Sequence, residues 1–280
     1  LYVCAVPIGN LEDASPRLRR VLGEVDAIAC EDTRSTRKLL DLLKITPVPR
    51  LLAHHDHNER ASAAGVVALL EQGLNVALVS DAGTPAINDP GAELVAATHA
   101  AGLLVNVVPG PSAVSAALSV AGGREHAAGS GYRYCGFLPR GERELVELLQ
   151  RHAHELCVAF ESPRRLAASL GVLAAQQPER IVTVCRELTK LHEQVLRGTA
   201  ENVAAAFADE VRGEVVLVLG PIEQVTPPAD ATDARAVELM LAMVEAGVGM
   251  KRSSKLVAEH LGGSSRALYE AGIAANSVDD

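Results

Sequence analysis

The sequence predicts an α/β fold with two consecutive α/β domains and a small helical region at the end of the chain. Its 280 residues are enough for two domains. Short apolar runs alternate with segments of helical spacing over most of the chain, which is typical of sheets covered by helices. This alternation stops after Pro221, where a proline-containing stretch precedes three short helical patterns.

The first predicted domain spans residues 1–121. Its expected strands are Leu1–Val6, Val25–Cys30, Leu74–Val79 and Leu104–Val108. Its expected helices are Pro16–Leu22, Thr36–Leu43, Ala61–Glu71 and Ala92–Ala101. Because strands and helices alternate, we expect a mainly parallel sheet with both faces covered. The double glycine after Ala121 is typical of a helix end, and we place the domain boundary there.

The second predicted domain spans residues 122–222 and repeats the alternation. Its expected strands are Tyr132–Phe137, Leu156–Phe160, Ile181–Cys185 and Val215–Leu219, with helices at Glu142–His152, Arg164–Ala175 and Ala200–Ala208. A linker over Val225–Asp230 then leads to a helix-turn-helix-like region over residues 230–275. Its three expected helices are Ala231–Ala246, Ser253–Leu261 and Ser265–Ala274.

The composition indicates which kinds of ligand and which cellular compartment are to be expected. The net charge of −9 argues against a general nucleic-acid binder, because phosphate affinity comes mostly from Lys and Arg. Local basic clusters would have to make any such contact. The five cysteines have no Cys-x-x-Cys spacing and are expected to be buried, reduced thiols of a cytoplasmic protein. No apolar run reaches the ~18 residues of a membrane helix, so no membrane association is expected.

Polar, glycine and proline residues follow the predicted strands. Ligands of doubly wound sheets bind beyond the carboxyl ends of the strands, so we expect a site where these residues gather. Asp81 is the strongest single candidate, with a ligand role and a purely structural acceptor role equally open. Asp89 and Ser162 each precede a proline and are interpreted as helix N-caps.

Several common sites are disfavoured by the sequence. There is no Gly-x-Gly-x-x-Gly and no Gly-x-x-x-x-Gly-Lys-Ser/Thr, which disfavours a standard dinucleotide site and a P-loop. The run His54–His57 resembles a metal site, but successive strand residues point to opposite faces of a sheet. We therefore expect no metal and interpret this run as a polar loop.

These motifs together resemble the bacterial small-subunit ribosomal RNA 2′-O-methyltransferases of the tetrapyrrole-methylase superfamily. Each motif alone is weak, but their order over essentially the whole chain is specific. The matching stretches are Val6–Asp13, Ala29–Leu40, Ser80–Pro85, Asn88–Gly91, Pro109–Ser112, Gly136–Pro139, Phe160–Pro163, Arg186–Lys190 and Arg212–Glu214.

The resemblance implies two α/β domains of the tetrapyrrole-methylase fold, with S-adenosyl-L-methionine as methyl donor in the cleft between them. It also implies a homodimer and, as substrate, a decoding-centre cytidine of 16S rRNA within the small ribosomal subunit. Carried over by motif, the donor-binding residues would be Pro7, Asp81, Gly83, Thr84, Ile87, Ser112, Phe160, Glu161, Leu188 and Gly213. The chain departs from the pattern over Gly123–Arg133, in having few lysines after Pro139, and at Arg164, where a histidine is common.

The catalytic residues are less well defined. A ribose hydroxyl is a poor nucleophile, so methyl transfer to it should benefit from a base or an orienting acceptor. Candidates near the strand ends are Asp32, Glu161, Glu187 and Lys190. We assign Asp32, Arg34 and Lys190 to the reaction, with an internal Asp32–Arg34 ion pair as the alternative.

Two other functions stay open at this point. One is a methylase of a tetrapyrrole intermediate, which the segment Glu31–Arg34 and the helical region argue against. The other is a non-catalytic RNA-binding assembly factor, which the intact Ser80–Pro85 loop argues against. Lys251, Arg252, Lys255 and Arg266 make part of the helical region locally positive, so we expect it to contact RNA, a ribosomal partner or a second copy of the chain.

Overall fold

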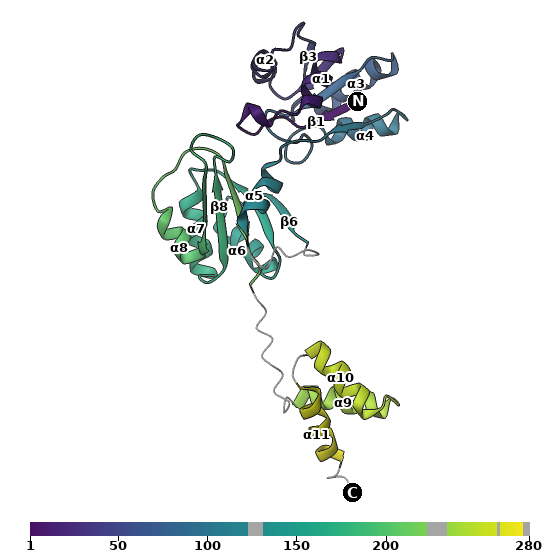
Figure 1. The fold of residues 1–280 in the computed structure, drawn as a ribbon, viewed down its shortest axis with the longest axis vertical. Coiled ribbons are helices and arrows are strands. Elements are labelled where there is room, and N and C mark those ends of the chain that lie inside the picture. The colour runs from purple at the N-terminus through teal and green to yellow at the C-terminus, as the bar shows by residue number, and fades with distance from the viewer. Residues whose placement is uncertain (123–130, 223–233, 262–263, 277–280) are drawn as a thin grey trace. The chain divides into compact units, whose positions relative to one another are not determined.

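The computed structural model describes residues 1–122, 131–222, 234–261 and 264–276. Inter-residue contacts divide the chain into two units, Leu1–Ile222 and Glu223–Asp280. The first unit contains two five-stranded sheets with their helices, and the second consists of helices (Figure 1). The predicted fold class, two α/β sheets followed by a helical region, is confirmed.

The first sheet is parallel throughout, as predicted. Its order is β3-β2-β4-β1-β5. The strands are β1 (Tyr2–Cys4), β2 (Ala27–Cys30), β3 (Arg50–Ala53), β4 (Val76–Val79) and β5 (Asn106–Val108). Tyr2 of β1 pairs with Ala77 of β4 on one side and with Asn106 of β5 on the other. Strand β3 is not among the predicted strands; it is an edge strand that has no fully buried residue.

Helices cover both faces of the first sheet. They are α1 (Pro16–Glu24), α2 (Thr33–Leu42), α3 (Glu59–Glu71) and α4 (Ala92–Ala100), with a short 3-10 helix, η1 (Leu11–Asp13). Alternate residues of each strand point to opposite faces, so Ile28 packs in the cluster with Leu18 of α1, while Ala27 packs with Leu94 of α4. Each cluster excludes water from one side of the sheet.

The second sheet is mixed. Its strands are β6 (Arg133–Phe137), β7 (Cys157–Glu161), β8 (Ile181–Arg186), β9 (Gln194–Thr199) and β10 (Val215–Leu219), in the order β6-β7-β10-β8-β9. Only β6 and β7 pair in parallel. The sequence analysis missed β9, whose edge position leaves most of its residues partly exposed. One face packs against α6 (Glu142–Arg151), α7 (Leu166–Gln176) and α8 (Ala200–Ala206).

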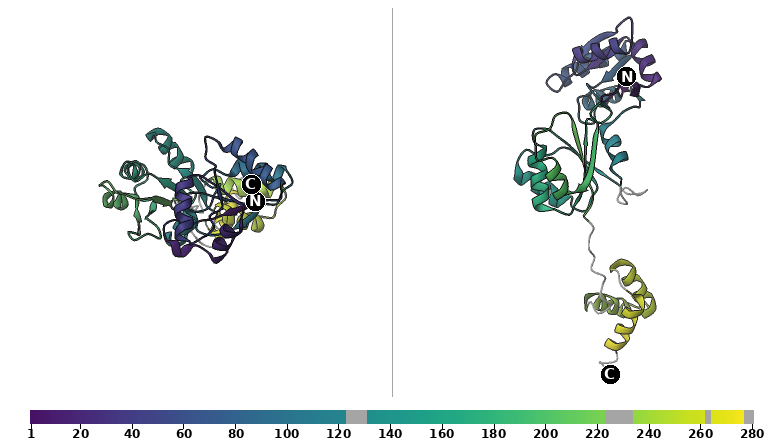
Figure 2. Two further views of the ribbon diagram at one scale, coloured as in Figure 1. Left: turned by 90° about the horizontal axis from the view of Figure 1, so that it is seen from above. Right: turned by 60° about the vertical axis from the view of Figure 1, so that its left-hand side comes forward.

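The other face of the second sheet is covered from the first domain. Helix α5 (Ala113–Ala121) follows β5 and packs Val114 and Ala117 against Val158 and Val216 (Figures 1 and 2). Ile8, from the loop after β1, lies in the same buried cluster. Apolar packing between these elements therefore fixes the loops of the first sheet beside the second sheet.

Two predicted helix caps are wrong. Helix α4 begins at Ala92 with Gly91 as its N-cap, and α7 begins at Leu166 with Arg165 as its N-cap. Gly91 has φ 136°, and its N–H donates to a carboxylate oxygen of Glu59 at 2.8 Å. A side chain of another helix thus replaces the local cap, and Asp89 is left outside the helix. Ser162 instead begins a turn in which its carbonyl accepts from Arg165 N–H at 2.9 Å.

The second unit has its own small core. Its helices are α9 (Ala234–Glu245), α10 (Met250–Leu261) and α11 (Ser265–Asn276). Met240, Val257 and Leu268 are buried together with Ala236. The predicted linker over residues 225–230 and the unusual residues 123–130 lie outside the described part of the chain. Among the described residues, no helix is long and apolar enough to cross a membrane.

We expect a protein ending at Ile222 to fold without the helices. The buried clusters of the two sheets draw only on residues before that point. The shortened protein should lose less than about 1 kcal/mol of unfolding free energy, roughly 2–4 °C in midpoint for a unit of this size. Thermal unfolding followed by circular dichroism measures this, and a larger loss would show that the two units stabilise each other.

Candidate active site

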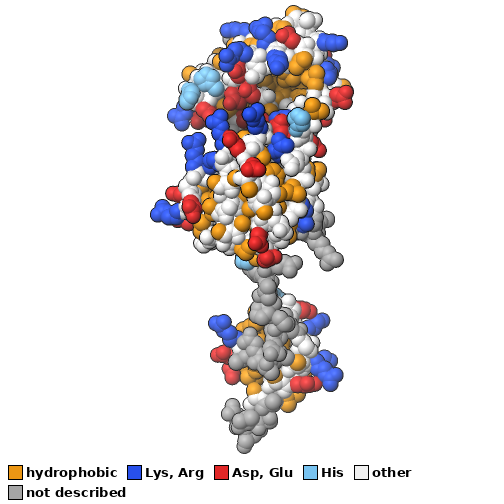
Figure 3. Space-filling view, turned by 90° about the vertical axis from the view of Figure 1, so that its left-hand side faces the viewer, with side chains coloured by type: hydrophobic (Ala, Val, Ile, Leu, Met, Phe, Trp, Pro, Cys, Tyr) orange, Lys and Arg blue, Asp and Glu red, His pale blue; other side chains and the backbone are white. Residues whose placement is uncertain are grey.

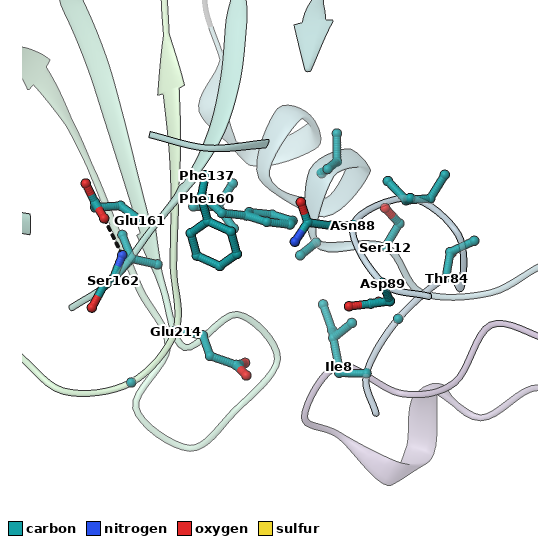
Figure 4. Close-up of a pocket in the computed structure, with 18 of the residues that line it drawn as sticks. Ile8, Thr84, Asn88, Asp89, Ser112, Phe137, Phe160, Glu161, Ser162 and Glu214 are labelled. Carbon is teal, nitrogen blue, oxygen red and sulfur yellow. Dashed lines mark hydrogen bonds between the residues drawn. The ribbon is translucent and has the colours of Figure 1, made fainter. Parts of the chain in front are cut away.

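A cavity of about 500 Å³ lies at the strand ends of the first unit. Its volume is within the range of small-ligand sites. Residues of the first domain line one side and residues of the second line the other (Figure 4). The lining residues are Ile8, Ala82, Gly83, Thr84, Ile87, Asn88, Asp89, Ser112, Ala113, Val114, Phe137, Phe160, Glu161, Ser162, Pro163, Gly213, Glu214, Val215 and Val216.

The structure brings most of the predicted donor-binding residues together. Gly83, Thr84, Ile87, Ser112, Phe160, Glu161 and Gly213 line this cavity. Three others lie outside the lining: Pro7 precedes Ile8, Leu188 is buried in the cluster around Ile8, and Asp81 is exposed. The parallel register explains the convergence, because the carboxyl ends of β1, β4 and β5 lie at one edge of the sheet.

Sequence reasoning missed several lining residues. They include Asn88, Asp89, Phe137, Ser162 and Glu214. All belong to the matched motifs, so the sequence did carry a signal for them. Asp89 and Ser162 were interpreted as helix caps, which removed them from consideration as site residues.

Aromatic side chains form one wall of the cavity. Two of the three phenylalanines in the chain are here, Phe137 and Phe160, with ring centroids 5.6 Å apart at an interplanar angle of 66°. Tyr134 packs edge-on against Phe160 at 5.5 Å, and its hydroxyl donates to Asn88 Oδ1 at 3.0 Å. Burial raises the pKa of Tyr134 to about 12. This hydrogen bond joins the two domains across the cavity, from β6 to the loop after β4.

Glu161 at the end of β7 is held by protein donors. Its carboxylate is fully buried and accepts from Ser162 N–H and from Ser169 Oγ, both at 2.5 Å. The Arg165 guanidinium lies 2.5 Å from the same carboxylate and also donates to the carbonyls of Leu138 and Pro139. Glu161 and Arg165 therefore brace the segment that follows Phe137 at the end of β6.

The loop after β4 approaches the loop after β1 closely. Val6 and Gly83 exchange backbone hydrogen bonds of 2.9 and 3.1 Å. Gly83 has φ +74°, and a Cβ there would lie 3.2 Å from Ile8 Cγ2. Thr84 Oγ1 donates to the carbonyl of Pro111 at 3.0 Å, which ties this loop to the one after β5. At position 83 the cavity wall is therefore formed by the backbone. A larger residue there would have a strained backbone and would crowd Ile8.

Asp32 and Arg34 form an internal ion pair, which was the alternative to a catalytic role for these two residues. Arg34 Nη2 lies 2.9 Å from Asp32 Oδ2, and the Arg34 backbone N–H donates to Asp32 Oδ1 at 2.7 Å as the cap of α2. Hydrogen bonds from the Arg34 side chain and backbone lower the pKa of Asp32 to about 2. Neither residue lines the cavity. A carboxylate so well satisfied is a weak base.

Lys190 is paired with two carboxylates beside the cavity. Its Nζ lies 2.9 Å from Glu187 Oε1 and 2.6 Å from Glu214 Oε2. Burial by itself lowers the pKa of Lys190, but the hydrogen bonds that Lys190 donates to Glu214 and Glu187 outweigh it, and the net change in its pKa is upward. Lys190 is therefore a protonated cation that holds Glu214 at the cavity rim.

The first-domain side of the cavity is acidic. Partial desolvation is the largest cause that raises the pKa values of Glu31, Asp81 and Asp89, and neighbouring carboxylates also raise them, while hydrogen bonds to each carboxylate act in the opposite direction. The neighbouring His54 is buried, with Nδ1 3.1 Å from Ser62 Oγ, and burial lowers its pKa. Within the described ranges, no group of His, Cys, Asp and Glu is arranged to hold a metal ion.

Comparison with known proteins gives a consistent picture. The model of the tetrapyrrole (corrin/porphyrin) methylases matches residues 1–204. The chain is 40% identical to "Ribosomal RNA small subunit methyltransferase I" of Synechocystis sp. (strain ATCC 27184 / PCC 6803 / Kazusa), over 96% of each chain. It is 40% identical to the protein of the same name from Escherichia coli O157:H7, over 96% of this chain and 93% of that one.

Solved structures share the fold at low identity. The methyltransferase CobJ matches with a TM-score of 0.57 and 20% identity, over 78% of this chain and 93% of its own. Diphthine synthase matches with a TM-score of 0.59 and 14% identity, over 78% and 88%. Uroporphyrin-III C-methyl transferase from Thermus thermophilus, complexed with S-adenyl homocysteine, matches with a TM-score of 0.53 and 19% identity, over 78% and 95%.

Replacing Arg165 should destabilise the protein strongly. Arg165→Met leaves the fully buried Glu161 carboxylate without its cation, which we expect to cost about 3 kcal/mol of unfolding free energy. Arg143→Met is the matched control, because Arg143 is 82% exposed beside Glu147 and its loss should cost under about 1 kcal/mol. Urea unfolding of both variants measures the difference, and equal losses would mean that the Arg165–Glu161 pair braces nothing.

Proposed function

The chain belongs to the tetrapyrrole (corrin/porphyrin) methylase family, and from this premise we propose that it methylates small-subunit ribosomal RNA with S-adenosyl-L-methionine as donor. The specific target that we propose is the ribose 2′-hydroxyl of a decoding-centre cytidine in 16S rRNA. The assembled small subunit is the proposed form of the substrate.

The extent of the similarity carries this proposal. The match to the tetrapyrrole methylases ends at residue 204, whereas the relatives named as ribosomal RNA methyltransferases align over 96% of the chain. Their alignment therefore includes most of the helical unit. This favours ribosomal RNA over a tetrapyrrole intermediate as the substrate, and it favours an enzyme over a non-catalytic assembly factor.

The cavity is suited to the proposed donor. Its volume is adequate, and its aromatic wall offers apolar contact. Gly83, Thr84, Ile87 and Ser112 would hold the donor from one side, and Phe160 and Gly213 from the other, with Pro7, Asp81, Glu161 and Leu188 supporting them. Bound there, the donor supplies an electrophilic methyl group on a sulfonium ion.

The residues of the chain contribute mainly by positioning and by excluding water. Phe137 and Phe160 cover one side of the cavity with apolar surface, and the Tyr134–Asn88 hydrogen bond fixes the separation of the two domains at this point. A rigid, largely dry site aligns two reactants and strengthens electrostatic interactions between them. Methyl transfer needs no covalent enzyme intermediate, which agrees with cysteines that are buried or partly buried away from the cavity lining.

Local basic surfaces support an RNA substrate despite the negative net charge. A surface hollow on α2 is lined by Arg34, Arg37 and Lys38 together with Thr33, Asp41 and Leu51, and Figure 3 shows several Lys and Arg side chains, with Asp and Glu between them, on the face of the α/β unit that it displays. In the helical unit, Lys251 and Arg252 at the start of α10 are exposed. Contacts of this kind would bind phosphate with a strong dependence on salt.

An exposed apolar edge supports a homodimer. Val107 in the edge strand β5 is 61% exposed, and Leu104, two residues before this strand, is 81% exposed. Exposed edge strands with apolar side chains favour pairing with another chain. We include the dimer in the proposed function on this basis.

Gly83→Val should abolish donor binding. The valine side chain would crowd Ile8 and project from the cavity wall, and the left-handed φ would add about 1–2 kcal/mol of strain. Gly102→Val is the matched control, because Gly102 has φ +70° but a Cβ there meets no atom within 4 Å. Calorimetric titration with S-adenosyl-L-methionine should show no binding for the first variant and normal binding for the second. Equal binding by both would place the donor elsewhere.

A methylation assay tests the proposed function as a whole. Small ribosomal subunits that lack the modification and a set of tetrapyrroles are offered with radiolabelled donor. We expect label in 16S rRNA, at one cytidine, in a nucleotide that resists alkaline cleavage because its 2′-oxygen is methylated. Label in a tetrapyrrole, or label at a base, would contradict the proposal.

A further inference from the structure

We infer that Asp89 is the proton acceptor of the methyl transfer, an assignment that rests on the proposed function. Asp89 lines the cavity and lies in the loop between β4 and α4. None of the ion pairs found among the described residues includes its carboxylate. It therefore differs from every other carboxylate that lines the cavity.

The other two carboxylates of the lining are already satisfied. Glu161 is fully buried between Arg165, Ser169 and the N–H of Ser162. Glu214 lies 2.6 Å from the ammonium of Lys190. The candidates outside the lining are satisfied too, since Asp32 is paired with Arg34 and Lys190 is a protonated cation. A proton acceptor needs a free lone pair facing the reactants, and within the described lining Asp89 offers one.

The loop around Asp89 is fixed on both sides. Before it, Asn88 accepts from the Tyr134 hydroxyl at 3.0 Å. After it, the N–H of Gly91 donates to Glu59 at 2.8 Å and so replaces the helix cap that Asp89 was expected to provide. Figure 4 shows the Asp89 carboxylate pointing into the space between Ile8 and the second-domain residues Phe137 and Glu214. The backbone on both sides of Asp89 is therefore held in place, and its carboxylate, which caps no helix, faces the cavity.

The surroundings of Asp89 make it a better base than an ordinary aspartate. Burial is the largest cause and raises its pKa, a hydrogen bond from the Ser80 side chain lowers it by less, and the Asp81 and Asp56 carboxylates raise it further. The remaining titratable groups that sense it are Glu31, whose pKa it raises, and Tyr134, which is protonated at neutral pH. A carboxylate with a raised pKa is still ionised at neutral pH but gains more free energy from taking up a proton.

The proposed step is balanced as follows. The hydroxyl oxygen of the acceptor forms a bond to the methyl carbon, and the electron pair of the methyl–sulfur bond remains on sulfur, which becomes neutral. The hydroxyl proton passes to the carboxylate of Asp89. Asp89 then releases this proton to water and returns to its ionised form.

An ionised, partly buried Asp89 lowers the unfolding free energy of the protein, and this effect can be measured without any substrate. A carboxyl whose pKa is raised by folding stabilises the folded protein when protonated and loses that contribution as the pH rises through its folded pKa. At pH 7.5 the ionised Asp89 is therefore unfavourable in the folded protein, and Asp89→Asn should raise the unfolding midpoint. The gain should shrink as the pH falls through the raised pKa of Asp89.

The test compares Asp89→Asn with Asp56→Asn in the full-length protein. Asp56 belongs to the same acidic group but is exposed and lies outside the cavity lining. For Asp89→Asn we expect kcat on small ribosomal subunits to fall by about 10²–10⁴-fold, while calorimetry gives a donor Kd within about threefold of wild type. The acid limb of the kcat–pH profile should disappear, and the unfolding midpoint at pH 7.5 should rise. Asp56→Asn should keep kcat and the acid limb.

Three results would overturn the assignment. A donor Kd that rises in parallel with the loss of kcat would show that Asp89 binds the donor. A lower unfolding midpoint at pH 7.5 would show that its carboxylate is structural. An unchanged kcat in an active wild-type background would show that the proton goes elsewhere. If the wild type binds the donor but leaves the subunits unmethylated, the proposed function itself fails, and the assignment of Asp89 fails with it.

Discussion

The packing of Ile8 and α5 against the second sheet is the constraint on which the cavity depends. Ile8 lies in the loop that follows β1, and Val114 and Ala117 lie in α5, which follows β5. All three are buried in one cluster with Val158 and Val216 of the second sheet. The loops that end the parallel strands are therefore held against β7 and β10. Without this contact, Gly83 and Asp89 would face solvent, and the aromatic wall would have no opposite side.

Charges around the cavity fall into two classes that the fold keeps apart. On the second-domain side, Glu161 and Glu214 each have a cationic partner, so they serve as fixed points that hold Arg165 and Lys190 in place. On the first-domain side, Asp89 and Glu31 lie near other carboxylates and bear the cost of burial. Carboxyl groups whose pKa is perturbed by burial and by neighbouring charges in a cavity are characteristic of functional sites, because binding and catalysis need pKa values matched to their task.

The sequence was sufficient for the architecture and for the position of the cavity, and insufficient for the roles of individual carboxylates. Buried strands such as β4 and β10 are continuous apolar runs, and the polar loops after parallel strands converge by geometry. The edge strands β3 and β9 were missed because partial exposure weakens their apolar pattern. Asp89 was mistaken for a cap because the residue that takes over at this helix end, Glu59, lies 30 positions earlier in the chain and only tertiary structure brings it there. The same holds for Lys190, whose partner Glu214 lies on another loop.

The acidic net charge of −9 does not conflict with an RNA substrate once the charges are located. The methyl donor is a cation, and the described lining of the cavity proposed for it contains the carboxylates Asp89, Glu161 and Glu214 but no Lys or Arg. Phosphate is an anion, and the hollow on α2 that presents Arg37 and Lys38 is a different surface from the cavity. Exposed charges that are farther apart than about 10 Å are largely screened at moderate salt, so each ligand responds to the charges near it and not to the total. A protein that must hold a cationic donor and a polyanionic substrate at once therefore gains by separating its acidic and basic residues, and its net charge says little about either partner.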